Sequence, residues 1–232
     1  MKHIEEITNY YGPLLAKQAL ELGAIRLQVQ KPFTWASGYR MPIYNDNRRL
    51  LAESSARKLV SEAFSAMLES LSFDPDNIAG TATAGIPHAT TLADRLEKPL
   101  SYVRSSGKDH GLGQQIEGLK QSGSYEGSQV LLIEDLISTG GSSIKAVEAI
   151  VAAQGICPYT LAIFTYGFAT AKDAFASLDP PCEFFTILDY DVMVKSALER
   201  GYVSSEEASL LTLWREDPFG WGAKQGFPRV ER

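Results

Sequence analysis

One segment constrains the fold of this chain more than any other: VLLIEDLISTGGSS, residues 130–143. Its first four residues are all apolar, which is typical of a strand buried on both faces of a sheet. A turn rich in glycine and hydroxyl residues follows, and apolar residues then recur with helical spacing from Ile144 to Val151. A buried strand, a tight turn and a helix form part of a βαβ unit. The segment therefore predicts an α/β fold with a mostly parallel sheet.

The rest of the chain alternates in the same way between short apolar runs and helical patterns. We expect one helix to begin at Gly12–Pro13 and end at Gly23, because proline is favoured in the first turn of a helix. The other expected helices are 50–71, 88–96, 191–199 and 205–214, and the expected strands are 77–81, 100–103, 130–133, 159–164 and 182–188.

Composition excludes several classes of protein. The chain has 232 residues and a net charge of −6, which makes general nucleic-acid binding a poor hypothesis. It has two cysteines and no Cys/His cluster, so we expect neither a disulfide framework nor a structural zinc site. No apolar run approaches 18 residues, and the N-terminus lacks the apolar core of a signal peptide. We therefore expect a cytoplasmic protein that does not bind membranes.

Two further segments stand out in the organisation of the chain. Residues 104–128 carry six glycines and show no periodicity, and a loop of that length inside a compact domain is usually functional or disordered. Residues 215–232 are rich in glycine and proline and show no regular pattern. We expect a single domain over residues 1–214, followed by a C-terminal tail.

The turn after the 130–133 strand carries the chemistry. Glu134 and Asp135 end the strand, and the unpaired N–H groups at the start of the following helix attract anions. Glycines let the backbone approach a phosphate closely, while two carboxylates suit sugar hydroxyls or a hydrated metal ion. The pattern suggests a ribose 5-phosphate pocket at the carboxyl end of a parallel strand. A plain βα turn explains the same residues, whereas the Walker A and GxGxxG patterns are absent.

This order of strand, Glu-Asp and Ser-Thr-Gly-Gly-Ser resembles the 5-phosphoribosyl 1-pyrophosphate (PRPP) signature of type I phosphoribosyltransferases. Three more segments, 32–48, 78–89 and 102–118, resemble orotate phosphoribosyltransferases of the bacterial form whose substrate loop begins FTWASG. The resemblance runs from about residue 14 to residue 214. It implies a central five-stranded parallel sheet with helices on both faces, and a small hood from about residues 14–49 and C-terminal elements.

The resemblance also implies a function. The family makes orotidine 5′-monophosphate and pyrophosphate from PRPP and orotate in pyrimidine biosynthesis, depends on Mg²⁺ and forms homodimers with shared active sites. No direct protein ligand to the metal is implied: Mg²⁺ would be held through PRPP and water near Glu134 and Asp135. The residues implied to bind PRPP are Thr83, Arg104, Lys108, His110, Glu134, Asp135, Leu136, Ile137, Ser138, Thr139, Gly140, Gly141 and Ser142.

Within that set, the resemblance gives catalytic roles to Asp135 and to three residues of the glycine-rich loop, Arg104, Lys108 and His110. The loop is implied to close over the site of the neighbouring subunit, with its cations facing the pyrophosphate. Ser105 stands where the family often has a second lysine, and lysines of some relatives are replaced by Ala36 and Ala84.

On the base side, the resemblance implies orotate contacts from Ser138, Tyr44 and Tyr166, and hood positions for Ser37 and Gly38. Many relatives place an arginine at position 166 against the orotate carboxylate. Tyrosine carries no positive charge, so a cationic side chain elsewhere must neutralise the orotate carboxylate. The available candidates are Arg40, Arg48 and Arg49.

Two other functions are consistent with the PRPP signature. A purine-type phosphoribosyltransferase shares it, but the segments 32–48 and 108–118 favour orotate as the base. A non-catalytic regulator could keep the fold and bind nucleic acid or a partner protein. The acidic net charge and the retained Lys108 and His110 favour an enzyme.

Overall fold

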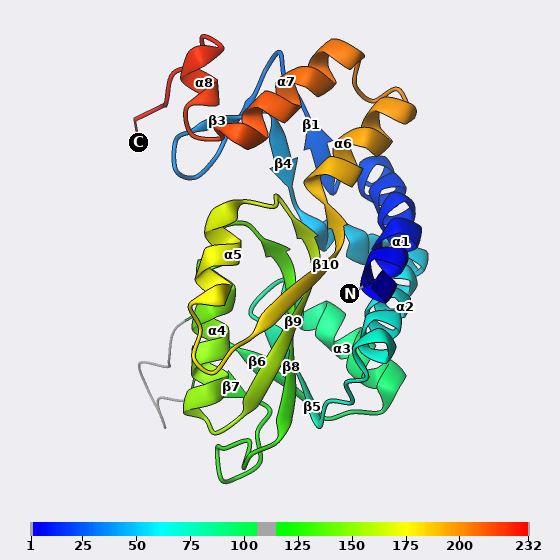
Figure 1. The fold of residues 1–232 in the computed structure, drawn as a ribbon, viewed down its shortest axis with the longest axis vertical. Helices are drawn as coiled ribbons and strands as arrows, with labels where there is room; N and C mark the ends of the chain where they lie inside the picture. The colour runs from blue at the N-terminus through cyan, green and yellow to red at the C-terminus, as the bar shows by residue number, and fades with distance from the viewer. Residues whose placement is uncertain (1, 106–114, 232) are drawn as a thin grey trace.

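The computed structural model describes residues 2–105 and 115–231 and is built around one six-stranded sheet (Figure 1). The strand order is β10-β9-β8-β5-β6-β7. Five of these strands are parallel, and β7 runs antiparallel to β6 at the edge, with Tyr102 opposite Glu117. The strands are β5 (Asn77–Thr81), β6 (Leu100–Val103), β7 (Ile116–Glu117), β8 (Gln129–Ile137), β9 (Ile156–Thr165) and β10 (Glu183–Asp189).

Helices cover both faces of this sheet, as the sequence predicted (Figure 1). One face carries α1 (Lys2–Glu21), α2 (Ser54–Leu71) and α3 (Gly85–Leu96); the other carries α4 (Gly141–Ala152) and α5 (Ala169–Ala176). Side chains alternate between the faces along a strand. In β8, Leu131 and Ile133 join the core under the first helices, whereas Val130 and Leu132 pack against α4. This explains why the whole run is apolar.

A hood lies beyond the carboxyl ends of the parallel strands, at the top of Figure 1. Its strands form two antiparallel pairs, in which β1 pairs with β4 and β2 pairs with β3. The hood elements are β1 (Ile25–Leu27), β2 (Phe33–Thr34), β3 (Arg40–Met41), β4 (Ile43–Asn45), the 3₁₀ helix η1 (Asn47–Ala52), α6 (Tyr190–Glu199), α7 (Ser205–Glu216) and α8 (Trp221–Lys224). No helix of the described chain has the length and hydropathy to cross a membrane.

Three expectations from the sequence need correction. The first helix begins at Lys2, not at Gly12–Pro13, and Pro13 lies inside it. Packing of α1 against α2, β10 and α6 outweighs the proline signal. The parallel sheet has an added antiparallel strand, because Ile116–Glu117 in the glycine-rich segment pairs with β6. The C-terminal tail is not without regular structure, since it contains α8.

Candidate active site

The two adjacent acidic residues at the end of β8 lie close together and have different hydrogen-bond partners. Glu134 faces α4, where its carboxylate Oε2 accepts a hydrogen bond from Ser143 Oγ at 3.2 Å. Asp135 lies on the hood side, and its main-chain carbonyl accepts a 2.6 Å hydrogen bond from Asn47 Nδ2 of η1. The two neighbouring carboxylates thus have different surroundings, although their side chains are close enough to interact.

Glu134 is held by the protein itself. Its carboxylate Oε1 accepts hydrogen bonds from Thr81 Oγ1 at 2.6 Å and from the Asp135 main-chain N–H at 3.0 Å. With the bond from Ser143, its two oxygens accept three hydrogen bonds, and the residue is only 5% exposed. Glu134 therefore ties the ends of β5 and β8 to the first turn of α4, while Asp135 is left as the carboxylate facing the hood.

The pKa values of both groups are raised. Burial, reinforced by the charge of Asp135, raises the pKa of Glu134 to about 7, although the Thr81 hydrogen bond opposes the shift. Burial also raises the pKa of Asp135, opposed by hydrogen bonding with Glu134 and by the positive charge of Arg48. Burial is thus the main cause of the raised pKa in both carboxyl groups.

This shift predicts a pH-dependent stability. The pKa of Glu134 is higher in the folded protein than its ordinary value of 4.5. Its contribution to the free energy of unfolding is therefore complete below about pH 4.5 and is lost as the pH rises through about 7. Glu134→Gln removes the titration, so the variant gains up to ~3 kcal/mol relative to wild type between those pH values. Urea unfolding over this pH range measures the difference.

The matched control is Glu148→Gln, which changes an exposed carboxylate on α4, the helix that follows β8. It should leave the pH dependence of wild type unchanged. Parallel stability curves for wild type and Glu134→Gln would show that Glu134 titrates with an ordinary pKa.

The turn between β8 and α4 leaves the main-chain N–H groups at the start of the helix without a side-chain cap among the described residues. Gly140 adopts φ +87°, a conformation that glycine accepts without strain, and no described side chain caps the start of α4. A Cβ built on Gly141 would meet no atom within 4 Å. Thr139 and Ser142 are exposed, Ser138 and Leu136 are half-buried, and Ile137 is fully buried. The main chain and hydroxyls of this turn can therefore approach a phosphate, whereas the Ile137 side chain belongs to the core.

A cavity of about 290 Å³ lies beside this turn. It brings together the ends of β5 and β6 with the first turns of α4. Its lining residues are Thr81, Ala82, Val103, Arg104, Ser105, Gly141, Ser142, Lys145 and Ala146. Thr83, predicted to face the pyrophosphate, is exposed in the turn that follows β5 but is not among the lining residues.

Of the three predicted loop cations, the structure places only Arg104. Its Nη1 lies 3.7 Å from Glu117 Oε1, and its main-chain N–H donates to Gln115 O at 2.9 Å. Lys108 and His110 lie outside the described residues. Their roles stay predictions.

On the base side, Tyr44 and Tyr166 differ in exposure. Tyr44 is half-buried, with its ring 5.6 Å from Phe33 and 4.9 Å from the Arg26 guanidinium. Tyr166 is 2% exposed, and its ring centroid lies 5.7 Å from that of Trp35 in the aromatic core under the hood. Burial and the charge of Asp135 raise the pKa of Tyr166. It is therefore a neutral residue close to the end of β8 that carries Asp135.

The three arginines considered for the orotate carboxylate occupy different places. Arg49 donates to Leu22 O at 3.3 Å, and Arg40 donates to Thr34 Oγ1 at 3.0 Å. Arg48 has electrostatic contact with both Tyr44 and Asp135. Its Nε donates a 2.6 Å hydrogen bond to Asp46 Oδ1, and its side chain is 64% exposed. Arg48 is the candidate on the site side of η1.

Comparisons with known proteins agree with this geometry. The model of the phosphoribosyl transferase domain family matches residues 47–186. An orotate phosphoribosyltransferase from Bacillus caldolyticus is 44% identical over 209 residues, which are 90% of this chain and 98% of that protein. The chain belongs to the orotate phosphoribosyltransferase family. It is therefore a phosphoribosyltransferase enzyme with the type I fold.

Solved structures support the same family fold. Orotate phosphoribosyltransferase from Aeropyrum pernix superposes with a TM-score of 0.65 at 27% identity, covering 82% of this chain and 99% of that one. The Mycobacterium tuberculosis enzyme in complex with PRPP has a TM-score of 0.59 at 21% identity, covering 78% and 97%.

Four side chains around this candidate site were not individually given a role from the sequence, although three of them lie in segments that it marked. They are Asn47, Thr81, Ser143 and Lys145. Ser143 stands at the end of the STGGSS run, and Thr81 stands at the end of a strand, so hydroxyls beside the acidic pair were the available signal. Nothing in the sequence separates Lys145 from other surface lysines, and only the cavity beside Arg104 identifies it.

Proposed function

We propose that this chain transfers the 5-phosphoribosyl group of PRPP to orotate, giving orotidine 5′-monophosphate and pyrophosphate in pyrimidine biosynthesis. The observation that carries the proposal is the position of Asp135, whose strand leads directly into the uncapped, open turn at the start of α4. A phosphate on that turn keeps the ribose of the same molecule close to the Asp135 carboxylate.

In the proposed reaction, the turn that follows β8 and the acidic residues at the end of β8 have separate roles. Ser138 to Ser142 hold the 5-phosphate through main-chain N–H groups and hydroxyls. The bond from C1 to the pyrophosphate oxygen breaks as the bond from C1 to the orotate nitrogen forms, and the proton of that nitrogen passes to the departing pyrophosphate or to water. Positive charge develops at C1 in this transition state, and the Asp135 carboxylate stabilises it. Glu134 orients the strand end and the cradle through Thr81 and Ser143.

Cationic side chains that line the cavity are proposed to stabilise the pyrophosphate leaving group. Arg104 and Lys145 both line it, next to the ends of β5 and β6. Lys145 supplies positive charge at a site where Ala84 and Ser105 replace lysines of relatives. With Lys108 and His110 from the glycine-rich loop, these cations stabilise the charge of the departing pyrophosphate.

The donor set fits a magnesium ion held indirectly. No group of three metal-ligating side chains occurs among the described residues. Glu134 is already satisfied by the protein, so Asp135 is the carboxylate that would hold Mg²⁺ through water, with PRPP as the main ligand. When bound, the ion would neutralise charge on the pyrophosphate and so ease its departure.

Arg48 is proposed to face the orotate carboxylate in place of the family arginine. Arg48→Gln should raise KM for orotate about 10–100-fold, because a charged hydrogen bond contributes roughly 1.5–3 kcal/mol. KM for PRPP should change little. Steady-state kinetics with each substrate varied in turn measures both constants.

Arg49→Gln is the matched control, since the neighbouring arginine donates to Leu22 O on the other side of η1. It should leave both constants near wild type. An unchanged KM for orotate in Arg48→Gln would remove Arg48 from the base site.

We also propose a cytoplasmic homodimer in which residues 104–118 of one subunit reach the site of the other. The net charge of −6 and the absence of a membrane-spanning helix among the described residues support this location. The two-fold arrangement is the simplest closed assembly for a shared site.

The deciding experiment is loss of orotate absorbance that requires both PRPP and Mg²⁺. Hypoxanthine, adenine and uracil are the control bases. Consumption of orotate, and of none of the three control bases, supports the proposal. Consumption of hypoxanthine or adenine instead would identify a purine-type enzyme, and PRPP binding without turnover of any base would identify a regulator.

A further inference from the structure

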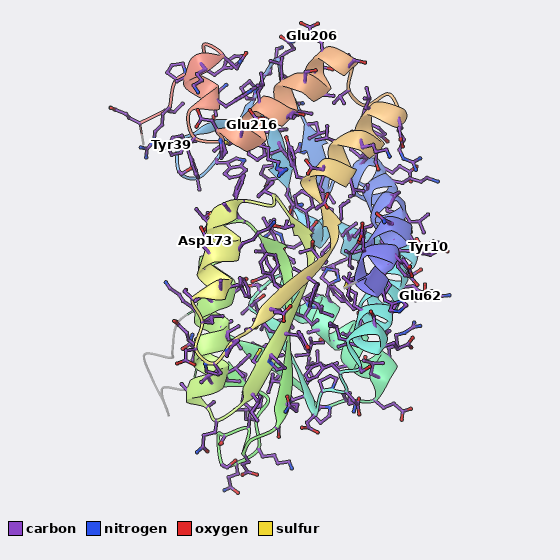
Figure 2. The ribbon with its side chains drawn as sticks, viewed as in Figure 1. Tyr10, Tyr39, Glu62, Asp173, Glu206 and Glu216 are labelled. Atoms are coloured by element: carbon purple, nitrogen blue, oxygen red, sulfur yellow. The ribbon has the colours of Figure 1, made fainter. Side chains whose placement is uncertain are left out.

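We propose that the C-terminal strap, residues 217–231, positions the hood loop at residues 32–44 and thereby sets the affinity for the base. The inference rests on the proposed function, because the hood loop is the segment expected to face orotate. The strap follows α7 and crosses the outer side of the hood next to Tyr39 (Figure 2).

The end of the strap is hydrogen-bonded to the tip of the hood loop. The Val230 main-chain N–H donates to Gly38 O at 2.9 Å, and Arg229 Nε donates to Ser37 O at 3.1 Å. Gly38 adopts φ +83°, and a Cβ on it would collide with the Val230 carbonyl oxygen. The glycine of the FTWASG pattern therefore meets a close-packed segment of the C-terminal strap.

Aromatic and cationic side chains extend this contact. The Arg229 guanidinium lies 4.7 Å from the centre of the Tyr39 ring, and Phe219 contacts the same ring at a centroid distance of 5.1 Å. Arg40 lies 5.9 Å from the centre of the Phe227 ring. Each such contact contributes modestly, but together they hold both sides of the loop tip.

The strap is itself anchored to the protein. Trp221 is 2% exposed, and its Nε1 donates to Leu210 O of α7 at 3.1 Å. Its ring stacks on Phe227 at 6.4 Å, and Lys224 Nζ lies 2.7 Å from Asp217 Oδ2. The residues that touch the loop thus extend from a fixed base.

The hood loop needs support from outside because its own pairing is short. Strands β2 and β3 share only two residue pairs, and a two-stranded ribbon of that size is at best marginally stable in water. On its inner side, Trp35 contacts Tyr166 at 5.7 Å, next to the strand end that carries Asp135. The strap therefore contacts the outer side of a loop whose inner side borders the proposed base site.

Val230→Pro tests this role because it removes the N–H that bonds Gly38. We expect KM for orotate to rise about tenfold, which corresponds to ~1.4 kcal/mol. KM for PRPP and kcat at saturating orotate should stay within about twofold, since the phosphate cradle and Asp135 lie elsewhere. Val230→Ala is the matched control, because it keeps the N–H and shortens a side chain that is 41% exposed.

A chain ending at Gly226 is the second variant, because it keeps the buried Trp221 but lacks Phe227, Arg229 and Val230. It should show the same rise in KM for orotate. Amide hydrogen exchange over residues 33–41 provides a readout that needs no activity, and protection should fall in both variants but not in Val230→Ala.

The possible outcomes distinguish a failure of the inference about the strap from a failure of the proposed function. Faster exchange with an unchanged KM for orotate would reduce the strap to a structural element, and unchanged exchange would show that it does not hold the loop; either result overturns the inference. A wild-type protein that consumes no orotate would instead overturn the proposed function, whatever the exchange data show.

Discussion

Asp135→Asn should lower kcat with PRPP and orotate by about 10²–10³-fold, the usual effect of removing one preorganised electrostatic group. The substitution keeps the size of the side chain and removes its negative charge. The charge acts on a transition state in which C1 is positive, so kcat should fall much more than substrate affinity. Steady-state kinetics and isothermal binding of PRPP measure the two effects.

The free energy of unfolding at neutral pH should not fall in the same variant, because burial raises the pKa of Asp135 and its charge is a cost in the folded protein. The Asn47 side chain donates to the main-chain carbonyl of residue 135, which the substitution leaves intact. Asp173→Asn, which changes an exposed carboxylate on α5, is the control for a loss of charge elsewhere (Figure 2). Near wild-type turnover in Asp135→Asn would refute the proposed role of this carboxylate.

The second large effect is recovery of activity in mixed dimers. Lys108→Ala and Asp135→Asn should each be nearly inactive as pure dimers. If Lys108 acts in the partner's site, a mixed dimer carries both substitutions in one site and neither in the other. Activity should then return to about half of the wild-type sites per mixed dimer, because the assembly has two-fold symmetry.

Exchange of subunits must be confirmed with differently tagged chains before the activity is measured. The control is a mixture of Lys108→Ala with wild type, which should contain active sites in proportion to the wild-type subunits. Confirmed mixed dimers with no recovered activity would place Lys108 over the site of its own subunit.

Much of the fold could be predicted from local sequence patterns. The strands 77–81 and 100–103 have the predicted bounds, and α7 begins at the predicted residue 205, where the Ser204 Oγ caps it by accepting from the Glu207 N–H. The order of a buried strand, an acidic pair and a glycine-rich turn predicted the family, which the comparisons confirm. These features depend on residues close together in the chain, so they can be predicted from the sequence without a structure.

Contacts between distant residues decided the rest. Pro13 predicted a helix start, but tertiary packing of α1 carries the helix through it. The sequence placed both Glu134 and Asp135 in the predicted PRPP site, whereas the structure shows that Thr81 and Ser143 hydrogen-bond the Glu134 carboxylate. Which face a carboxylate meets depends on what packs there, and short-range patterns do not contain that information.

The same distinction separates the two sides of the active site. The sequence by itself predicted the strand, turn and helix start that we propose as the phosphate cradle, because they are contiguous and their unpaired N–H groups follow from helix geometry. Only the tertiary structure decided which arginine faces Asp135, that Lys145 lines the cavity, and that Val230 bonds Gly38. Those pairings join residues far apart in the chain, and they exist only once the sheet, the hood and the C-terminal strap have packed together.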